Sequence, residues 1–355
     1  MEIISKIKTE ISKITTCKNI SLHCSGTDAL YEIIKSLELE KDDTVLIPSF
    51  ICERILLPFL KLKIKTKLVD IQHQTVTAGL HNYQSVYDPT VKVLLLVHPW
   101  GYVSNDIFRI IKWAKEKNIV VIEDIASALG LSYQGVKLGR LGKYCFGSFG
   151  HDKLCAVGEI GFSNLKNIDS LDLKHKTKGN QLITYNTLIK FFRKRYFELI
   201  RPFVLDFLSH IPRFSFKRAV SVDSMNHLLD KLSFYYHEVN ERKSLVDFYL
   251  TSIKGIFDFT ILPPNNDQDV VLRVACVFNS SFVRDEIILS AMEKNLWLGK
   301  DYPVPLHDWL FYPKGNFEQT ILLQKRIINL ITNPTNQDGK EVMEMIKYAL
   351  PQNSK

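Results

Sequence analysis

The feature that most constrains the fold of this chain is an alternation of short apolar runs with segments long enough to form helices. The runs cover residues 44–47, 67–71, 91–97 and 119–123, and turn-forming or charged residues bound them. Residues 27–39 carry apolar side chains at i, i+3, i+4 spacing, which predicts a helix, and residues 105–117 can hold another. This alternation predicts βαβ units.

Two stretches of these runs, 93–97 and 119–122, are apolar on both faces, which is typical of parallel strands covered by helices on each side. Ligands of open α/β sheets bind at the carboxyl ends of the strands. His98 and Asp124 stand directly at two such ends. The sequence therefore predicts a polar site there, although Asp124 could instead cap the segment that follows it.

The length of 355 residues suggests two domains at roughly 150 residues each, or one large domain with an appendage. We expect a large α/β domain over residues 1–220 and a smaller α+β domain over residues 221–355. For the second domain, the pattern predicts one long or two shorter helices in 222–253 and a final helix over 340–349. Between these we expect strands over 255–262, 269–278 and 297–304 and a helix over 284–294.

The composition is that of an ordinary globular protein, with 46% hydrophobic and 24% charged residues. This excludes disordered, collagen-like and coiled-coil classes. The six cysteines form no CxxC pair, so reduced thiols are expected. No stretch resembles a signal peptide or a membrane span, and a cytoplasmic protein is predicted.

The net charge of +8 is concentrated in one segment, residues 171–220, which holds eleven Lys or Arg against three acids. The segment is either a solvated helix face or a groove for an anionic ligand. Its aromatic residues recur near helical spacing, which favours core packing over stacking on bases. No nucleic-acid partner is predicted.

The segment Ser25-Gly26-Thr27 opens the helix expected at 27–39. A glycine and two hydroxyls at a helix N-terminus suit an anion, because backbone N–H groups and the helix dipole both favour negative charge there. Serine and threonine are also the commonest N-caps. Phosphate binding and simple capping both remain open on this motif alone.

Six motifs follow one another at spacings that resemble one family. They are SGTDAL, IPSF, VHPWGY, VIEDIASALG, FGSFGHDKLCAVGEIG and DYPVPLH, between Ser25 and His307. In this order they resemble the DegT/DnrJ/EryC1/StrS family of pyridoxal-phosphate-dependent sugar aminotransferases. The resemblance implies fold type I, with a mostly parallel, seven-stranded-type sheet in a large domain and a smaller C-terminal α+β domain. It also implies a homodimer.

The resemblance also implies roles for individual residues. Lys153 is the implied catalytic residue, which binds pyridoxal 5'-phosphate covalently and moves the substrate's α-proton. Asp124 is implied to keep the ring nitrogen protonated. The implied phosphate contacts are Gly26, Thr27 and Ser148, the other cofactor positions are Cys52 and Ser127, and the substrate positions are Arg218, Tyr302 and His307. No metal ion is implied.

Three positions depart from the family's pattern. Cys52 stands where an aromatic residue usually stacks on the cofactor, and Ser127 stands where Gln or His is usual. No asparagine of an Asn-x-Arg motif occurs near residues 214–218, so Arg218 is the candidate phosphate contact. His307 is either a substrate contact or an exposed structural histidine.

The implied function is transfer of an amino group, from glutamate, to a nucleotide-linked keto sugar on the way to an amino sugar. A dehydratase is an alternative, since one branch of the family replaces the lysine with histidine. Here Lys153 is retained and the histidine, His151, lies two residues earlier, which favours transamination. A non-catalytic scaffold or regulator is the other alternative, and the three departures favour it.

Overall fold

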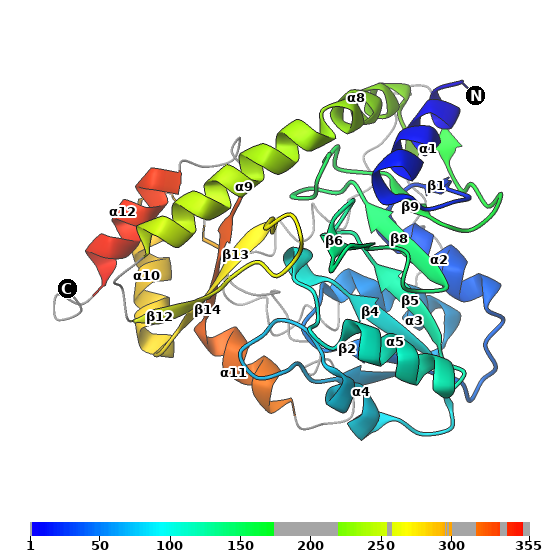
Figure 1. Ribbon diagram of the computed structural model, residues 1–355, viewed down its shortest axis with the longest axis horizontal. Helices are drawn as coiled ribbons and strands as arrows, with labels where there is room; N and C mark the ends of the chain where they lie inside the picture. The colour runs from blue at the N-terminus through cyan, green and yellow to red at the C-terminus, as the bar shows by residue number, and fades with distance from the viewer. Residues whose placement is uncertain are drawn as a thin grey trace.

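Seven strands form the main sheet of the computed structural model, which describes residues 2–173, 219–253, 258–294, 296, 298–299, 317–333 and 339–350. The strand order is β1-β9-β8-β5-β4-β2-β3 (Figure 1). Strand β9 runs antiparallel to both of its neighbours, and the remaining pairs are parallel. The strands are β1 (Ser21–His23), β2 (Thr44–Pro48), β3 (Lys65–Val69), β4 (Val91–Val97), β5 (Val120–Asp124), β8 (Tyr144–Ser148) and β9 (Gly161–Ser163).

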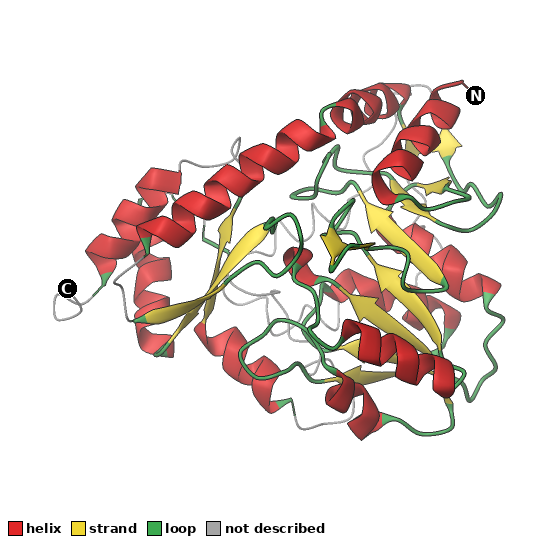
Figure 2. Cartoon of the chain, viewed as in Figure 1, coloured by secondary structure: helices red, strands yellow, loops and turns green. Residues whose placement is uncertain are grey.

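Helices cover both faces of this sheet, as Figure 2 shows. Side chains of β4 alternate between two hydrophobic clusters. Leu95 packs with Ile33, whereas Leu96 packs with Ile110. The doubly apolar runs of the sequence therefore bury both faces of their strands, as expected. The helices of this part are α1 (Glu2–Thr15), α2 (Gly26–Ser36), α3 (Leu56–Leu62), α4 (Leu80–Val86) and α5 (Ile107–Glu116).

A smaller antiparallel sheet lies in the C-terminal part of the chain and has the order β12-β13-β14. Its strands and the helices around it are β12 (Phe259–Leu262), β13 (Arg273–Phe278), β14 (Ile327–Ile331), α10 (Ser281–Glu293), α11 (Glu318–Arg326) and α12 (Gly339–Ala349). These elements share a hydrophobic cluster with Phe50, Trp100 and Tyr102 of the N-terminal part. The two sheets are thus joined by apolar contacts.

Two helices connect the sheets. Helix α8 (Val222–Ser233) begins at an N-cap, Ser221, and packs on α1. Helix α9 (Tyr235–Ser252) follows after a break at Phe234 and runs towards the smaller sheet (Figure 1). The segment 222–253 therefore forms two helices, which was one of the two sequence expectations.

The α/β fold class is confirmed, with a mostly parallel sheet of seven strands. The sequence pattern did not indicate β14, and the strand expected at 297–304 lies mostly outside the described residues. The domain boundary after residue 220 stays a prediction. No helix in the described part of the chain is both long and apolar enough to cross a membrane.

Candidate active site

Three parallel strands bring predicted polar residues to one edge of the main sheet. Asp124 is the last residue of β5, Ser148 is the last residue of β8, and His98 directly follows β4. These strands are neighbours in the order β8-β5-β4. Because parallel strands end at the same edge, the side chains at their ends converge there.

Lys153 lies in the loop after β8, and its amine reaches this edge. Its Nζ donates a hydrogen bond to Ser127 Oγ at 2.7 Å. Burial lowers the pKa of the Lys153 amine, and the Asp124 carboxylate and the Cys52 thiol act in the opposite direction. A larger fraction of this amine is therefore neutral near pH 7 than in a surface lysine.

The Asp124 carboxylate is buried, with 7% of the residue exposed. It accepts a hydrogen bond from the Ala126 N–H at 2.9 Å. This contact is the capping of the following segment that the sequence analysis gave as an alternative for Asp124. Burial raises the pKa of Asp124, while the Ala126 N–H, Lys153 and His98 lower it. Among the described residues it forms no ion pair within 4.0 Å, so a cationic ligand beside it would be stabilised.

His98, which directly follows β4, lies at the same edge of the sheet. Its Nε2 lies 3.0 Å from Glu123 Oε1, and both side chains are fully buried. Glu123 Oε2 also accepts the N–H groups of Leu141 and Gly142. The buried Nδ1 of His98 has no hydrogen-bond partner within the described residues. A buried, unpaired polar atom in a native protein is uncommon and frequently marks a ligand site.

The predicted phosphate residues also lie together. A Cβ placed on Gly26 would stand 2.8 Å from Ser148 Cβ, so only glycine lets the end of β8 approach the start of α2 this closely. Thr27 follows in the first turn, and Ser25 caps the helix by accepting the Asp28 N–H at 3.1 Å. First-turn amides lack intrahelical acceptors, so this helix start suits an anion.

We expect Gly161→Ala to loosen this helix start. The added Cβ would lie 2.3 Å from the backbone carbon of Ser25 and 2.4 Å from the backbone nitrogen of Gly26, so backbone must move. Overpacking of this kind costs about 1–3 kcal/mol of unfolding free energy, measurable by denaturant titration. Gly150→Ala is the control, since its Cβ would approach only the Ser148 Oγ at 3.3 Å. Equal stability of the two variants would contradict the close approach.

These groups fit pyridoxal phosphate. The amine of Lys153 suits the cofactor's aldehyde, the buried carboxylate of Asp124 suits its pyridine nitrogen, and the α2 start with Ser148 suits its phosphate. Cys52 lies near enough to Lys153 to affect its pKa. Ser127 binds the amine directly despite its short side chain. No group of His, Cys, Asp or Glu suited to a metal ion occurs among the residues described.

Arg218, Tyr302 and His307 lie outside the described residues, as does the basic segment from 174 to 218. The described ends of that segment form a short parallel pair between β10 (Asp172–Leu173) and β11 (Ala219–Val220).

Sequence reasoning missed the charged residues that surround the Lys153 loop. Asp152 pairs with Arg273 of β13 at 3.1 Å, and Glu238 pairs with Arg242 of α9 at 2.8 Å. The i, i+4 spacing of Glu238 and Arg242 is a visible helical signal. Their contacts with the Lys153 loop join residues 83 and 89 positions apart, and no local pattern in the sequence indicates contacts that depend on the fold.

Residues 4–176 match the model of the DegT/DnrJ/EryC1/StrS aminotransferase family. The matched residues make up just under half of the chain. The recognition made from the six motifs is thus confirmed, although the match ends before the DYPVPLH motif.

Relatives and a solved structure agree with this assignment. Protein MosB of Rhizobium meliloti is 34% identical over 139 residues, which are 39% of this chain and 27% of that protein. GDP-perosamine synthase of Caulobacter vibrioides is 29% identical over 137 residues, covering 39% of this chain and 37% of the synthase. The aligned region therefore spans about a third of the length of these relatives.

The likeness in structure covers nearly the whole chain. Spr1654 of Streptococcus pneumoniae, a candidate sugar aminotransferase solved in its PLP form, has a TM-score of 0.74 and 19% sequence identity. The match covers 98% of this chain and 92% of that one. At this identity the likeness shows the fold, and the expected fold type I architecture is confirmed.

Proposed function

We propose that this protein is a pyridoxal-phosphate-dependent aminotransferase. The observation that carries the proposal is the convergence of a partly buried lysine, in the loop after β8, and a buried carboxylate at the end of the adjacent parallel strand β5. Burial lowers the pKa of the Lys153 amine and raises the pKa of Asp124. Titratable groups with environments of this kind are typical of catalytic sites.

Lys153 would hold the cofactor covalently, Asp124 would face its ring nitrogen, and Gly26, Thr27 and Ser148 would bind its phosphate. When bound, pyridoxal phosphate supplies an electron sink that stabilises negative charge at the substrate's α-carbon. The chain's own groups supply binding and proton transfer.

The Lys153 amine acts as the general base of the proposed reaction. Its lowered pKa leaves more of it unprotonated at neutral pH, so it can accept the proton from the α-carbon of an amino donor. Ser127 Oγ orients the amine by accepting its hydrogen bond at 2.7 Å. Asp124 remains ionised once a cation faces it, because the cation offsets the desolvation that raises its pKa.

We further propose glutamate as the amino donor, a nucleotide-linked keto sugar as the acceptor and a homodimer as the active form. The family resemblance supports all three, and the named activity of the Caulobacter relative supports the sugar class. The retained Lys153 favours amino transfer over dehydration. The product would be a nucleotide-linked amino sugar.

Isotopically labelled glutamate tests this function. The protein with added pyridoxal phosphate is incubated with labelled glutamate and with GDP-, UDP- or dTDP-linked keto sugars, and the products are analysed by mass spectrometry. Labelled nitrogen in a sugar nucleotide is the expected result. Loss of water from the sugar without nitrogen uptake would favour the dehydratase. Failure to retain pyridoxal phosphate would favour a non-catalytic role.

The basic segment provides a prediction about the acceptor. Changing Arg193 and Lys194 to glutamine should raise the KM for the sugar nucleotide at least about tenfold, because charged hydrogen bonds to its diphosphate are lost. The glutamate half-reaction should not change, since glutamate carries no diphosphate. Steady-state and half-reaction kinetics measure both.

Lys112→Gln with Lys115→Gln is the matched control, because both lysines are exposed on α5. An unaltered KM in the Arg193/Lys194 variant, together with tight, salt-sensitive binding of the unmodified protein to nucleic acid, would contradict this role for the segment.

A further inference from the structure

The loop that carries Lys153 is held in an unfavourable backbone conformation. Asp152 has φ of 64° and Cys155 has φ of 54°, both in the left-handed region that side chains other than glycine's seldom adopt. Such strain persists only where surrounding contacts fix the backbone, and it is common at functional sites. The contacts that fix this loop therefore also fix the direction of the Lys153 side chain.

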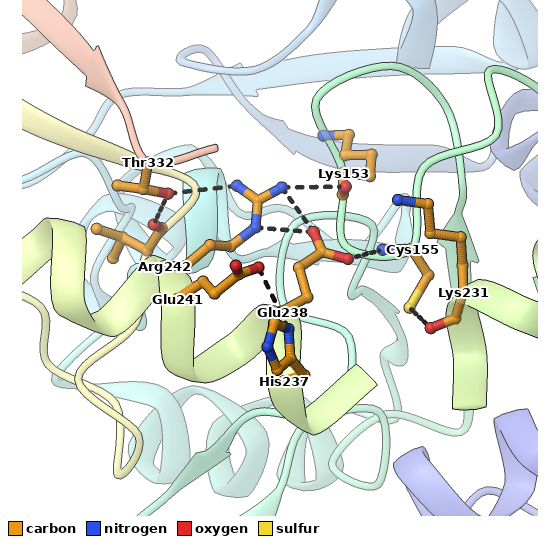
Figure 3. A network of polar contacts seen from close by, with 9 residues as sticks. Lys153, Cys155, Lys231, His237, Glu238, Glu241, Arg242 and Thr332 are labelled. Carbon is orange, nitrogen blue, oxygen red and sulfur yellow. Dashed lines mark hydrogen bonds and ion pairs between the residues drawn. The ribbon is translucent and has the colours of Figure 1, made fainter. Parts of the chain in front are cut away.

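Two of these contacts come from helix α9. The guanidinium of Arg242, whose side chain is 1% exposed, donates from Nε and Nη2 to Glu238 Oε1 at 2.9 and 2.8 Å. The other oxygen of Glu238, Oε2, accepts the backbone N–H of Cys155 at 3.0 Å. Through this hydrogen bond, the ion pair within α9 contacts Cys155, one of the two strained residues of the loop (Figure 3).

Arg242 also reaches the backbone of Lys153 itself. Its Nη2 donates a long hydrogen bond of 3.4 Å to the Lys153 carbonyl oxygen. The contact is with the backbone oxygen, while the Lys153 amine donates its hydrogen bond to Ser127. The arginine therefore acts on the main chain and not on the reacting atom.

The same guanidinium is tied to the smaller sheet. Its Nη1 donates to Thr332 Oγ1 at 3.3 Å, directly after β14, and the Thr332 hydroxyl donates to the Val271 carbonyl at 2.6 Å. Every nitrogen of the guanidinium has an acceptor. A buried guanidinium with all of its hydrogen bonds made holds its neighbours in a fixed arrangement. Removing it would leave the Glu238 carboxylate without its ion-pair partner.

We propose that Arg242 is a positioning residue: with Glu238 it clamps the loop from 152 to 155 to helix α9 and the smaller sheet, and so directs the Lys153 amine to Ser127. The proposal rests on the proposed function, because it assigns a purpose to the direction of that amine.

The test compares Arg242→Met and Glu238→Gln with the unmodified full chain, freed of any cofactor. Lys243→Met is the matched control. It removes the neighbouring cation of the same helix, but Lys243 pairs with Asp269 and its side chain is 43% exposed. Competitive acetylation with acetic anhydride, read by mass spectrometry of the Lys153 peptide across pH, gives the titration midpoint of this one amine.

The direction of the shift follows from the groups around the amine. Burial is the largest influence on the pKa of Lys153 and lowers it. Asp124 of β5, Cys52 after β2 and Asp152 raise it, and Arg273 of β13 lowers it. None of these groups is changed by the variants. A released loop would admit water to the amine, so its midpoint should move to higher pH by about one unit.

The expected result is this upward shift in Arg242→Met, a smaller one in Glu238→Gln and none in Lys243→Met. At a pH one unit below the midpoint of the unmodified chain, the free amine limits the reaction, so the amount of pyridoxal phosphate that borohydride traps on Lys153 should fall by up to about tenfold in Arg242→Met. A midpoint equal to that of the unmodified chain would overturn the proposal. If Arg242→Met does not fold, as judged by circular dichroism, Glu238→Gln decides by the same criterion.

Failure of this inference and failure of the proposed function give different results. If the unmodified chain traps no pyridoxal phosphate on Lys153, the proposed function fails. The titration midpoints from acetylation still show whether Arg242 and Glu238 position the Lys153 amine. If the unmodified chain traps it and the variants keep the original midpoint, the function stands and the clamp is wrong.

Discussion

Replacing Lys153 with alanine should abolish covalent trapping of pyridoxal phosphate by borohydride and slow the glutamate half-reaction by about 100- to 10,000-fold, the range for a lost general base. The reason is that this amine donates a hydrogen bond to Ser127 and that burial lowers its pKa, so that it can act as a base near neutral pH. Mass spectrometry of the reduced protein measures trapping, and stopped-flow absorbance measures the half-reaction.

Lys137→Ala is the matched control for this experiment. Burial also lowers the pKa of Lys137, but this residue lies on a separate hairpin strand, β7 (Val136–Lys137), and its amine donates to the Gly130 carbonyl. We expect normal trapping in that variant. A reduced covalent adduct that persists in Lys153→Ala would show that another amine binds the cofactor.

The second large effect is expected for Asp124→Asn. An amide keeps the shape of the side chain and can still accept the Ala126 N–H, but it carries no charge to hold a proton on the ring nitrogen. A neighbouring carboxylate moves the pKa of a cation by about 1–3 units, so the half-reaction should slow by about 10- to 1,000-fold. Single-turnover kinetics with glutamate measure the change.

Asp70→Asn serves as the control, because Asp70 directly follows β3 of the same sheet. Its carboxylate accepts the N–H groups of Gln319 and Thr320 and carries a structural role. This variant should lose stability and keep its half-reaction rate within about twofold, because its charge is not among those that affect the pKa of Lys153. Unchanged rates in Asp124→Asn would remove Asp124 from the site.

Much of the main sheet could be predicted because its signals are local. The runs that form β2, β4 and β5 are short, apolar and bounded by polar residues. Strand β9 has only three residues, Gly161–Ser163, and its antiparallel pairing with β8 depends on the intervening loop. Its sequence therefore lacks the periodicity that identified the other strands.

The candidate site was predicted in part, for a similar reason. Asp124 and Ser148 end adjacent strands, so strand position alone brings them together. The fold-dependent contact of Arg242 with the Lys153 carbonyl joins residues 89 positions apart. No local pattern encodes such a contact, and helix α9 shows only an ordinary i, i+4 ion pair.

The visible absorbance spectrum of the purified protein, taken with pyridoxal phosphate before and after addition of glutamate, tests the central claim most directly. We predict a visible band from cofactor bound to Lys153, which glutamate converts to the band of the aminated cofactor while an equal amount of 2-oxoglutarate is released. A band that glutamate leaves unchanged would contradict transamination from glutamate, and the absence of any band would contradict the assignment of Lys153 and Asp124 to a cofactor site.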